Sequence, residues 1–519
     1  MPVARTHAIA LVGVAGHLVE VEADIQNGLP GLLLVGLPDT ALREARDRIR
    51  AAIVNSREQW PQRRITVGLS PASLPKRGSG FDASIAVAIL AAAGAVPAAA
   101  IEGVAFVGEL GLDGQLRPVP GVLPAAAAAA ASGLRRVAVP RANAAEASLV
   151  PGVRVLSAGT LPGLLRWLRD GASSPADPVQ VIDGGREPAG RAPGGGPPGP
   201  GPDLADVLGQ PTARRAAEIS AAGGHHLCLL GPPGAGKTML AERIPALLPR
   251  LDMAAALEVT SIHSVAGALP DQGPLLTVPP FCAPHHTASK AAIVGGGSGV
   301  IRPGAASLAH RGLLFLDEAP EFGRDVLDAL RQPLESGEVV IARSGLTARF
   351  PARFTLVLAA NPCPCAKGPG HQSGCECTPA VRRRYLARLS GPLLDRVDVK
   401  AEFLPVSRGE LLSDAAFAER SAVVAARVAA ARQRAAERLR GTPWRLNAEI
   451  PGREFSRRFR PAAGALAPLE RAMDRGQISA RGVHRALRVA WTLADLAGLP
   501  RPGAEQTSYA LGLWLGGPA

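Results

Sequence analysis

The chain lacks the features that mark membrane, secreted and disordered proteins. Its longest uncharged run, residues 83–101, is rich in alanine and interrupted by glycine and proline, so it is a poor membrane span. We expect no secretory leader at the start of the chain, because His17, Glu20 and Glu22 interrupt the first apolar stretch. Cysteine is scarce, with six residues in 519. We therefore expect a cytoplasmic protein without a membrane partner, whose cysteines are metal ligands or reduced thiols rather than disulfides.

Acidic residues are in the minority. The 57 Lys and Arg residues, mostly arginine, outnumber the 44 Asp and Glu residues, which gives a net charge of +13 and a pI of about 10.4. This balance suggests a polyanionic partner, although enrichment in alanine, glycine and arginine can also reflect genomic base composition. With 47% apolar and 19% charged residues the chain is globular, and its length suggests two to four domains.

The chain contains a phosphate-binding loop. Residues 231–238 fit the pattern G-x-x-x-x-G-K-[ST], between a strand expected over 226–230 and a helix expected over 239–248. In this pattern the backbone N–H groups surround a phosphate, the lysine neutralises phosphate charge and the threonine hydroxyl holds Mg²⁺. We therefore predict that ATP is bound by Gly231, Pro232, Pro233, Gly234, Ala235, Gly236, Lys237 and Thr238.

Two further strands bring polar residues to the same nucleotide. A hydrophobic strand over 312–316 ends in Asp317 and Glu318, about 80 residues after the loop. Asp317 is then a ligand of Mg²⁺, and Glu318 orients the attacking water. A strand expected over 354–360 delivers Asn361 to its carboxyl end, where doubly wound sheets place ligand-contacting residues.

Composition divides the chain into four parts. These are 1–170, a Gly/Pro-rich linker over 171–203, an ATPase core over 204–404 and a helical part over 405–519. The strands expected in the first part are 65–69 and 103–107, and its helices are 41–55, 83–93 and a polyalanine helix after residue 124. In the last part, helices are expected over 406–440 and 461–498.

An insertion with little regular pattern, residues 260–310, lies inside the ATPase core. It is glycine-rich and basic, with His285, His286, Lys290 and Arg302, and could reach DNA as a pore loop. It could equally be a mobile surface loop. We interpret the paired histidines as packing or substrate contacts rather than metal ligands, because no matching acid or cysteine spacing lies nearby.

A basic hairpin is expected over 338–350, around a turn at 344–345. Arg343 lies beside its tip and Arg349 further along its second strand. The hairpin is a second candidate for DNA contact, and a solvated surface hairpin is the alternative.

Four of the six cysteines fall within fifteen positions. Cys363, Cys365, Cys375 and Cys377 offer four thiolates, the number that a closed tetrahedral zinc site needs. The spacing differs from common zinc ribbons, His371 could compete as a ligand, and four reduced thiols in a loop are the alternative. We predict a structural Zn²⁺ in this loop, 363–377.

Hydrolysis also needs a cation on the γ-phosphate, which a neighbouring subunit can supply. Arg396 is our candidate, and its alternative role is a local ion pair with Asp395 or Asp398.

The first part of the chain resembles the proteolytic domain of Lon-type proteases, notably over 71–78 and 108–114. That family uses a Ser–Lys dyad, and the equivalent positions here are Gly80 and Leu123. Ser79 lies one residue away, but no lysine base is evident to activate it. The resemblance therefore implies a non-proteolytic α+β domain of this type, related to ribosomal S5 domain 2.

The chain as a whole resembles the YifB/ComM family of magnesium-chelatase-like AAA+ ATPases. The resemblance rests on the phosphate loop, Pro-His-His-Thr, Gly-Gly-Gly, Leu-Asp-Glu-Ala-Pro-Glu-Phe, the cysteine loop, Leu-Leu-Asp-Arg and Ser-Ala-Arg-Gly. One departure is Cys282, where the family leads us to expect a basic residue. In such ATPases Asn361 would be the sensor 1 residue that positions the water, and Arg481 the sensor 2 residue of the helical lid.

The resemblance implies an α/β fold, with an AAA+ core and helical lid after the Lon-like domain. It also implies an ATP-driven homohexamer that acts on branched or single-stranded DNA as a branch-migration or helicase-type motor. A chelatase-type ATPase that powers metal insertion and an ATP-dependent protease remain alternatives. The missing dyad argues against the protease, the Lon-like domain argues against a chelatase subunit, and the high pI mildly favours DNA.

Overall fold

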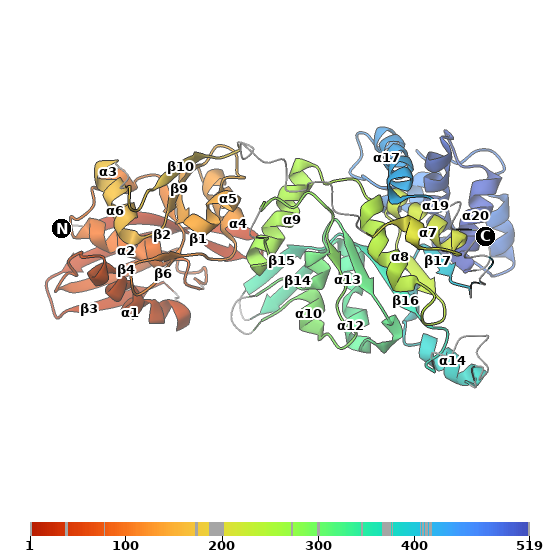
Figure 1. Cartoon of the computed structure of the whole chain (residues 1–519), viewed down its shortest axis with the longest axis horizontal. Helices are drawn as coiled ribbons and strands as arrows, with labels where there is room; N and C mark the ends of the chain where they lie inside the picture. Colours follow the sequence, from red (N-terminus) through yellow and green to blue (C-terminus); the bar gives the residue numbers. More distant parts are fainter. Residues whose placement is uncertain are drawn as a thin grey trace.

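The chain forms three parts in a row (Figure 1): a mixed sheet with helices at the N-terminal end, a parallel sheet in the middle and a helical part at the C-terminal end. The computed structural model describes residues 3–36, 40–76, 78–171, 175–185, 202–270, 273–297, 301–343, 346–365, 375, 377–404, 406, 409, 414 and 418–516. The Ser344-Gly345 turn and most of the linker lie outside these residues.

The N-terminal part is built on an eight-stranded mixed sheet, ordered β10-β9-β8-β5-β1-β2-β4-β3. Its strands are β1 (Val3–Val12), β2 (Ala15–Gln26), β3 (Gly31–Val35), β4 (Arg64–Ser70), β5 (Val104–Phe106), β8 (Arg136–Pro140), β9 (Arg154–Ala158) and β10 (Gln180–Asp183). A small hairpin, β6 (Glu109–Leu110) and β7 (Leu116–Arg117), lies beside it. The helices are α1 (Thr40–Asn55), α2 (Asp82–Ala92), α3 (Ala98–Ile101), α4 (Val122–Ala131), α5 (Ala144–Ala147) and α6 (Leu161–Asp170), with the 3₁₀ turn η1 (Arg141–Asn143).

This sheet is covered on both faces. Successive side chains of a strand point to opposite faces, and β5 shows it: Val104 and Phe106 pack with α1, α2 and α6, whereas Ala105 and Val107 pack with α4 and α5. The four side chains are buried, which explains why the sequence of this strand is apolar throughout.

The central part is a five-stranded parallel sheet, ordered β12-β13-β16-β11-β17. Its strands are β11 (Leu227–Leu230), β12 (Phe281–Cys282), β13 (Leu313–Leu316), β16 (Thr355–Ala360) and β17 (Val399–Glu402). The hairpin β14 (Glu338–Arg343) and β15 (Leu346–Pro351) stands apart as a two-stranded sheet. The helices are α7 (Pro211–Gly223), α8 (Lys237–Arg243), α9 (Met253–Ala266), α10 (Lys290–Val294), α11 (Ala305–Leu308), α12 (Arg324–Ala329), α13 (Arg331–Ser336), α14 (Pro379–Leu386) and α15 (Gly391–Leu394), with the 3₁₀ turns η2 (Leu204–Asp206), η3 (Ile244–Leu247) and η4 (Ala319–Glu321).

The C-terminal part shares a core with one face of this sheet. It comprises α17 (Ser421–Arg438), α18 (Ala467–Asp474), α19 (Ala480–Ala497) and α20 (Ala504–Leu515), with the 3₁₀ turns η5 (Asn447–Glu449) and η6 (Gly452–Phe455). Leu313 and Phe315 of β13 lie in the same apolar cluster as Trp491 of α19, whereas Leu314 and Leu316 face the cluster under α10, α11, α12 and α15. The helical part is therefore packed against the sheet that carries the nucleotide motifs.

The N-terminal part contacts the central part through the tip of the β1–β2 hairpin and through α9. Leu11, Val12 and Val14 pack against a small apolar cluster that includes Phe350 of β15. Ser264 of α9 donates a hydrogen bond to the buried carboxylate of Glu146, at 2.7 Å. The N-terminal part therefore contacts α9 through its helices and the basic hairpin through the β1–β2 tip.

The prediction of a helix over 239–248 is wrong in its second half. α8 ends at Arg243, and Ile244–Leu247 form a 3₁₀ turn. Pro245 lacks the N–H that an α-helix would use, which explains the early end. The insertion also has more regular structure than its sequence suggested, because α9 continues to Ala266 and β12 joins the edge of the sheet.

The contact at Gly13 gives a testable prediction. Gly13 has φ of +67°, and a Cβ there would lie 2.5 Å from the backbone oxygen of Arg349. Gly133 has φ of +83° with no heavy atom within 4 Å of such a Cβ. Both alanine variants carry the left-handed strain of about 1–2 kcal/mol. Only Gly13→Ala also pushes the tip of the β1–β2 hairpin away from Arg349 of β15. We expect Gly13→Ala, unlike Gly133→Ala, to speed amide hydrogen exchange over residues 338–351; equal exchange in the two variants would contradict the docking.

Candidate active site

The phosphate loop joins β11 to α8. Two of its glycines take the left-handed conformation that favours glycine, Gly234 with φ of +73° and Gly236 with φ of +95°. Gly231 leaves no room for a side chain, because a Cβ there would lie 2.5 Å from the Phe403 side chain. These three positions explain the glycine pattern of the motif.

Lys237 reaches across the loop to the neighbouring strand. Its Nζ donates hydrogen bonds to the backbone oxygens of Gly231 (2.7 Å) and Pro232 (2.8 Å) and to Oδ1 of Asn361 (3.0 Å). Burial lowers the pKa of Lys237, while Asp317 and Glu318 act to raise it. The amine is thus held at the point where the phosphate loop meets the end of β16.

The acidic pair lies on the other side of the loop. Thr238 Oγ1 donates a hydrogen bond of 2.6 Å to Oδ2 of Asp317, which places the hydroxyl and the carboxylate side by side, as two ligands of one Mg²⁺ would need. Glu318 has φ of +49°, in the left-handed region that non-glycine residues rarely adopt. Its backbone N–H donates to Oδ1 of Asp317 at 2.9 Å, and its side chain is 50% exposed.

His286 has a carboxylate neighbour that the sequence did not predict. Its Nδ1 lies 3.4 Å from Oε2 of Glu318, and its ring lies 4.1 Å from that of His285. A cavity of about 300 Å³ opens here, and its lining combines the loop after β12 with the acidic pair. The lining residues are Thr238, Glu242, Phe281, Ala283, Pro284, His285, His286, Phe315, Asp317 and Glu318. The interpretation of the histidines as packing or substrate contacts overlooked this neighbour, which only the pairing of β12 with β13 brings close.

Arg396 does not pair with Asp395 or Asp398. It is 8% exposed, forms an ion pair with Glu335 of α13 and donates to the Pro392 carbonyl. Burial lowers its pKa, and neighbouring arginines lower it further. Arg396 is therefore held by contacts within its own chain.

Two arginines of α19 approach the segment around Arg396. Arg481 is 60% exposed, and its Nη1 lies 4.0 Å from Oδ2 of Asp395. Arg485, which the sequence did not single out, donates to Oδ1 of Asp398 (2.5 Å) and to the Arg396 carbonyl (2.8 Å). The structure thus places the first two turns of α19 against the segment that joins α15 to β17.

The cysteine loop brings four sulfurs together. Cys363, Cys365, Cys375 and Cys377 each offer a Sγ atom within 4.8 Å of the other three, and three of the pairs lie at 3.2, 3.3 and 3.4 Å. Four sulfurs at about 2.3 Å from one Zn²⁺ in a tetrahedron would lie about 3.8 Å apart. The four side chains therefore fit a metal ion of this kind after small shifts.

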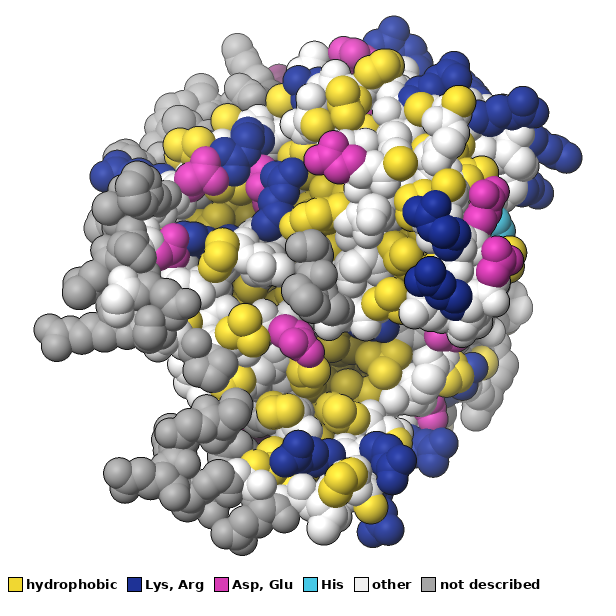
Figure 2. All heavy atoms as spheres, turned by 90° about the vertical axis from the view of Figure 1, so that its right-hand side faces the viewer, with side chains coloured by type: hydrophobic (Ala, Val, Ile, Leu, Met, Phe, Trp, Pro, Cys, Tyr) yellow, Lys and Arg dark blue, Asp and Glu magenta, His cyan; other side chains and the backbone are white. Residues whose placement is uncertain are grey.

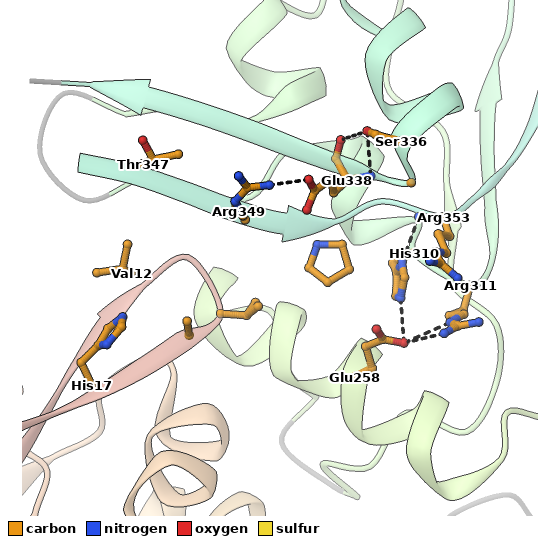
Figure 3. A pocket seen from close by; sticks show the side chains of 14 residues that line it. Val12, His17, Glu258, His310, Arg311, Ser336, Glu338, Thr347, Arg349 and Arg353 are labelled. Carbon is orange, nitrogen blue, oxygen red and sulfur yellow. Dashed lines mark hydrogen bonds and ion pairs between the residues drawn. The ribbon is translucent and has the colours of Figure 1, made fainter. Parts of the chain in front are cut away.

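The basic hairpin lies beside a second, larger cavity of about 460 Å³ (Figure 3). Arg349 points along the hairpin to Glu338, with Nη1 2.6 Å from Oε1. Across the cavity, Glu258 of α9 accepts from Arg311 at 2.9 Å and lies 3.0 Å from Nε2 of His310. These partners hold the pKa of Glu258 at about 2, with His310 the largest cause. The cavity is thus bounded by ion pairs of the central part and by the N-terminal hairpin.

The N-terminal part shows no paired Ser–Lys dyad among its described residues. The Ser79 hydroxyl donates to the Glu109 carboxylate, and Lys76, which is fully buried, donates to the Pro71 carbonyl. Leu123 is buried in α4.

Three family models match the chain in succession. Residues 21–143 match the model described as subunit ChlI of Mg-chelatase, residues 203–411 match magnesium chelatase, subunit ChlI, and residues 418–513 match the C-terminal part of that subunit. Full-length relatives agree. Competence protein ComM of Haemophilus influenzae is 41% identical over 518 residues, which cover 99% of this chain and 97% of the relative.

The chain belongs to the YifB/ComM family of magnesium-chelatase-like AAA+ ATPases. The protein YifB of Escherichia coli is 41% identical over 497 residues, covering 96% of this chain and 94% of the relative. A Mycobacterium tuberculosis protein is 52% identical over 511 residues, with 98% of each chain covered.

Membership confirms the resemblance that the motifs suggested. It also confirms the α/β P-loop ATPase fold, which agrees with the five-stranded parallel sheet. Among the described residues, no helix combines the length and apolar character that crossing a bilayer requires.

Proposed function

We propose that this member of the YifB/ComM family is an ATP-hydrolysing motor that moves DNA strands as a homohexamer. The observation that carries the ATP-hydrolysing part of the proposal is the meeting of Lys237, Asn361, Thr238 and Asp317 at one edge of the parallel sheet. A lysine, an amide, a hydroxyl and a carboxylate converge there on a phosphate loop, which is the set of groups that nucleotide hydrolysis requires.

Each residue has a defined task in this proposal. Lys237 neutralises the β- and γ-phosphates, Glu318 orients and deprotonates the attacking water, and Asn361 positions that water. Mg²⁺, held by Thr238 and Asp317, would compensate phosphate charge when bound. Arg481 of α19 contacts the nucleotide from the helical lid.

In the proposed hexamer, a neighbouring subunit would supply the cation that hydrolysis needs at the γ-phosphate. Arg396 is our candidate for the cation supplied to a neighbouring subunit, and its ion pair with Glu335 would have to open on assembly. Glu335 is 59% exposed, so its carboxylate can separate from Arg396 without becoming buried.

Three observations support DNA as the substrate. The net charge of +13 favours a polyanion. Arg343 of the hairpin is exposed and pairs with no carboxylate of the described residues. A relative that matches nearly the whole chain is named competence protein ComM. These observations favour a branch-migration or helicase-type activity over a chelatase-type one.

We also propose that the four cysteines bind a structural Zn²⁺. Since four thiolates make one closed site, elemental analysis of protein purified without added metal should find about one zinc per chain. Cys375→Ser should lower this content, whereas Cys228→Ser, a change at a buried cysteine outside the cluster, should leave it unchanged. Zinc-free protein with four titratable thiols in the loop would contradict the proposal.

Lys237 and Glu318 should be needed for different reasons. Lys237→Ala removes charge compensation and should weaken both ATP binding and turnover. Glu318→Gln keeps the shape of the site but loses water activation, so it should bind ATP while turnover falls by about 100-fold or more. Nucleotide binding and steady-state hydrolysis, measured on both variants, check this; near-normal turnover in both would refute the ATPase assignment.

DNA remodelling is tested with a synthetic four-way junction incubated with ATP at modest salt. We expect binding that weakens steeply as salt rises, stimulation of hydrolysis and resolution into duplexes. Arg343→Ala with Arg349→Ala should impair strand movement more than basal hydrolysis, because neither side chain lies at the nucleotide. If the junction is neither bound nor resolved and DNA never stimulates hydrolysis, the motor proposal fails in favour of a chelatase-type ATPase.

A further inference from the structure

Helix α14 carries an arginine run that the nucleotide site does not use. Residues 378–394 contain four arginines and no acidic residue. Arg382, Arg383 and Arg384 are exposed, and no carboxylate of the described part of the chain lies within ion-pair distance of them. The helix lies at the lowest point of the molecule in Figure 1, and Figure 2 shows Lys and Arg side chains gathered on that lowest lobe.

Both ends of α14 are tied to the candidate active site. At its start, Thr378 caps the helix by accepting from the Val381 N–H, directly after Cys377 of the sulfur cluster. That cluster begins at Cys363, two residues beyond Asn361. The start of α14 is therefore held by the segment that follows β16 and Asn361.

The far end of α14 is tied to the acidic motif. Arg388 donates to Oε2 of Glu321 at 3.0 Å and to the Pro320 carbonyl at 3.3 Å. Tyr385 is buried, and burial together with the negative charges of Glu321 and Glu318 raises its pKa to about 12. Glu321 follows Glu318 by one 3₁₀ turn, so a displacement of α14 acts on the backbone next to Glu318.

The chemistry of the run fits a sugar-phosphate backbone. Guanidinium groups pair with phosphate oxygens in bidentate fashion, and three adjacent exposed arginines provide three such donors. No aromatic side chain is exposed on the helix to stack on a base, since its one aromatic residue, Tyr385, is buried. Contacts of this type set affinity and position without reading sequence.

We infer that α14 binds the phosphate backbone of a DNA strand through Arg382, Arg383 and Arg384, and that this contact stimulates hydrolysis through Arg388 and Glu321. The inference rests on the proposed DNA motor and names a strand-binding element outside the basic hairpin. In this inference the sulfur cluster fixes the start of the strand-binding helix.

The test is a salt titration of junction binding. The triple variant Arg382→Ala, Arg383→Ala, Arg384→Ala loses three phosphate contacts, so the slope of log K against log salt should fall in magnitude by about 2 to 3. The same triple change to lysine keeps the charges and should restore most of the slope. The matched control is Arg50→Ala, Arg63→Ala, Arg64→Ala, three exposed arginines of the N-terminal part, which should keep the wild-type slope.

Hydrolysis supplies the second measurement. The triple alanine variant should keep basal turnover but lose stimulation by the junction, whereas Arg388→Ala should bind the junction normally and lose the stimulation. The inference is overturned if wild-type protein binds the junction and the triple alanine variant keeps the wild-type salt slope and stimulation of hydrolysis. It is also overturned if the slope and stimulation of that variant fall no further than those of the control. In both cases the motor proposal stands. If wild-type protein does not bind DNA at all, both fail.

Discussion

The parallel pairing of β11 with β16 is the constraint on which the candidate active site depends. Leu230 of β11 pairs with Ala360 of β16, so the residues that follow, Gly231 and Asn361, leave the sheet at the same level. The Gly231 N–H then donates to the Ala360 oxygen, and Lys237 can reach Asn361 although 124 positions separate them in sequence. A shift by one residue would turn the end of β16 to the opposite face and remove the amide from the site.

The same sheet fixes the helical part through a buried charge. Asp398 precedes β17, and its carboxylate contacts His225 beside β11 and Arg485 of α19. Burial opposes ionisation of Asp398, but the His225 hydrogen bond and the Arg485 charge outweigh it and hold the pKa below its usual range. Since removing one partner of a buried pair leaves an uncompensated charge, this contact keeps α19 in place, and with it Arg481.

Local patterns and motif spacing predicted most of the central fold, but only part of the site. Gly231 to Thr238, Asp317 and Asn361 could be recognised because each follows an apolar strand, and parallel strands share one carboxyl edge. The contacts of His286 with Glu318 and of Arg485 with Asp398 could not be predicted, since the partners come from distant segments and no local pattern encodes them. The contact between Gly13 and Arg349 could not be predicted for the same reason, because the sequence shows the glycine but not its partner. The helix over 239–248 was overextended because the apolar spacing was given more weight than Pro245.

Two neighbours of the acidic motif come from segments that leave the parallel sheet. His286 reaches Glu318 from the insertion after β12, and Arg388, in the segment after β16, reaches Glu321. The amine of Lys237 is held by the loop and its neighbouring strand, so its position requires neither of these segments. The surroundings of Glu318 do depend on them, and its backbone already has an unusual conformation. In the proposed function the binding of nucleotide is therefore local, whereas its hydrolysis depends on where the insertion and the segment after β16 are held.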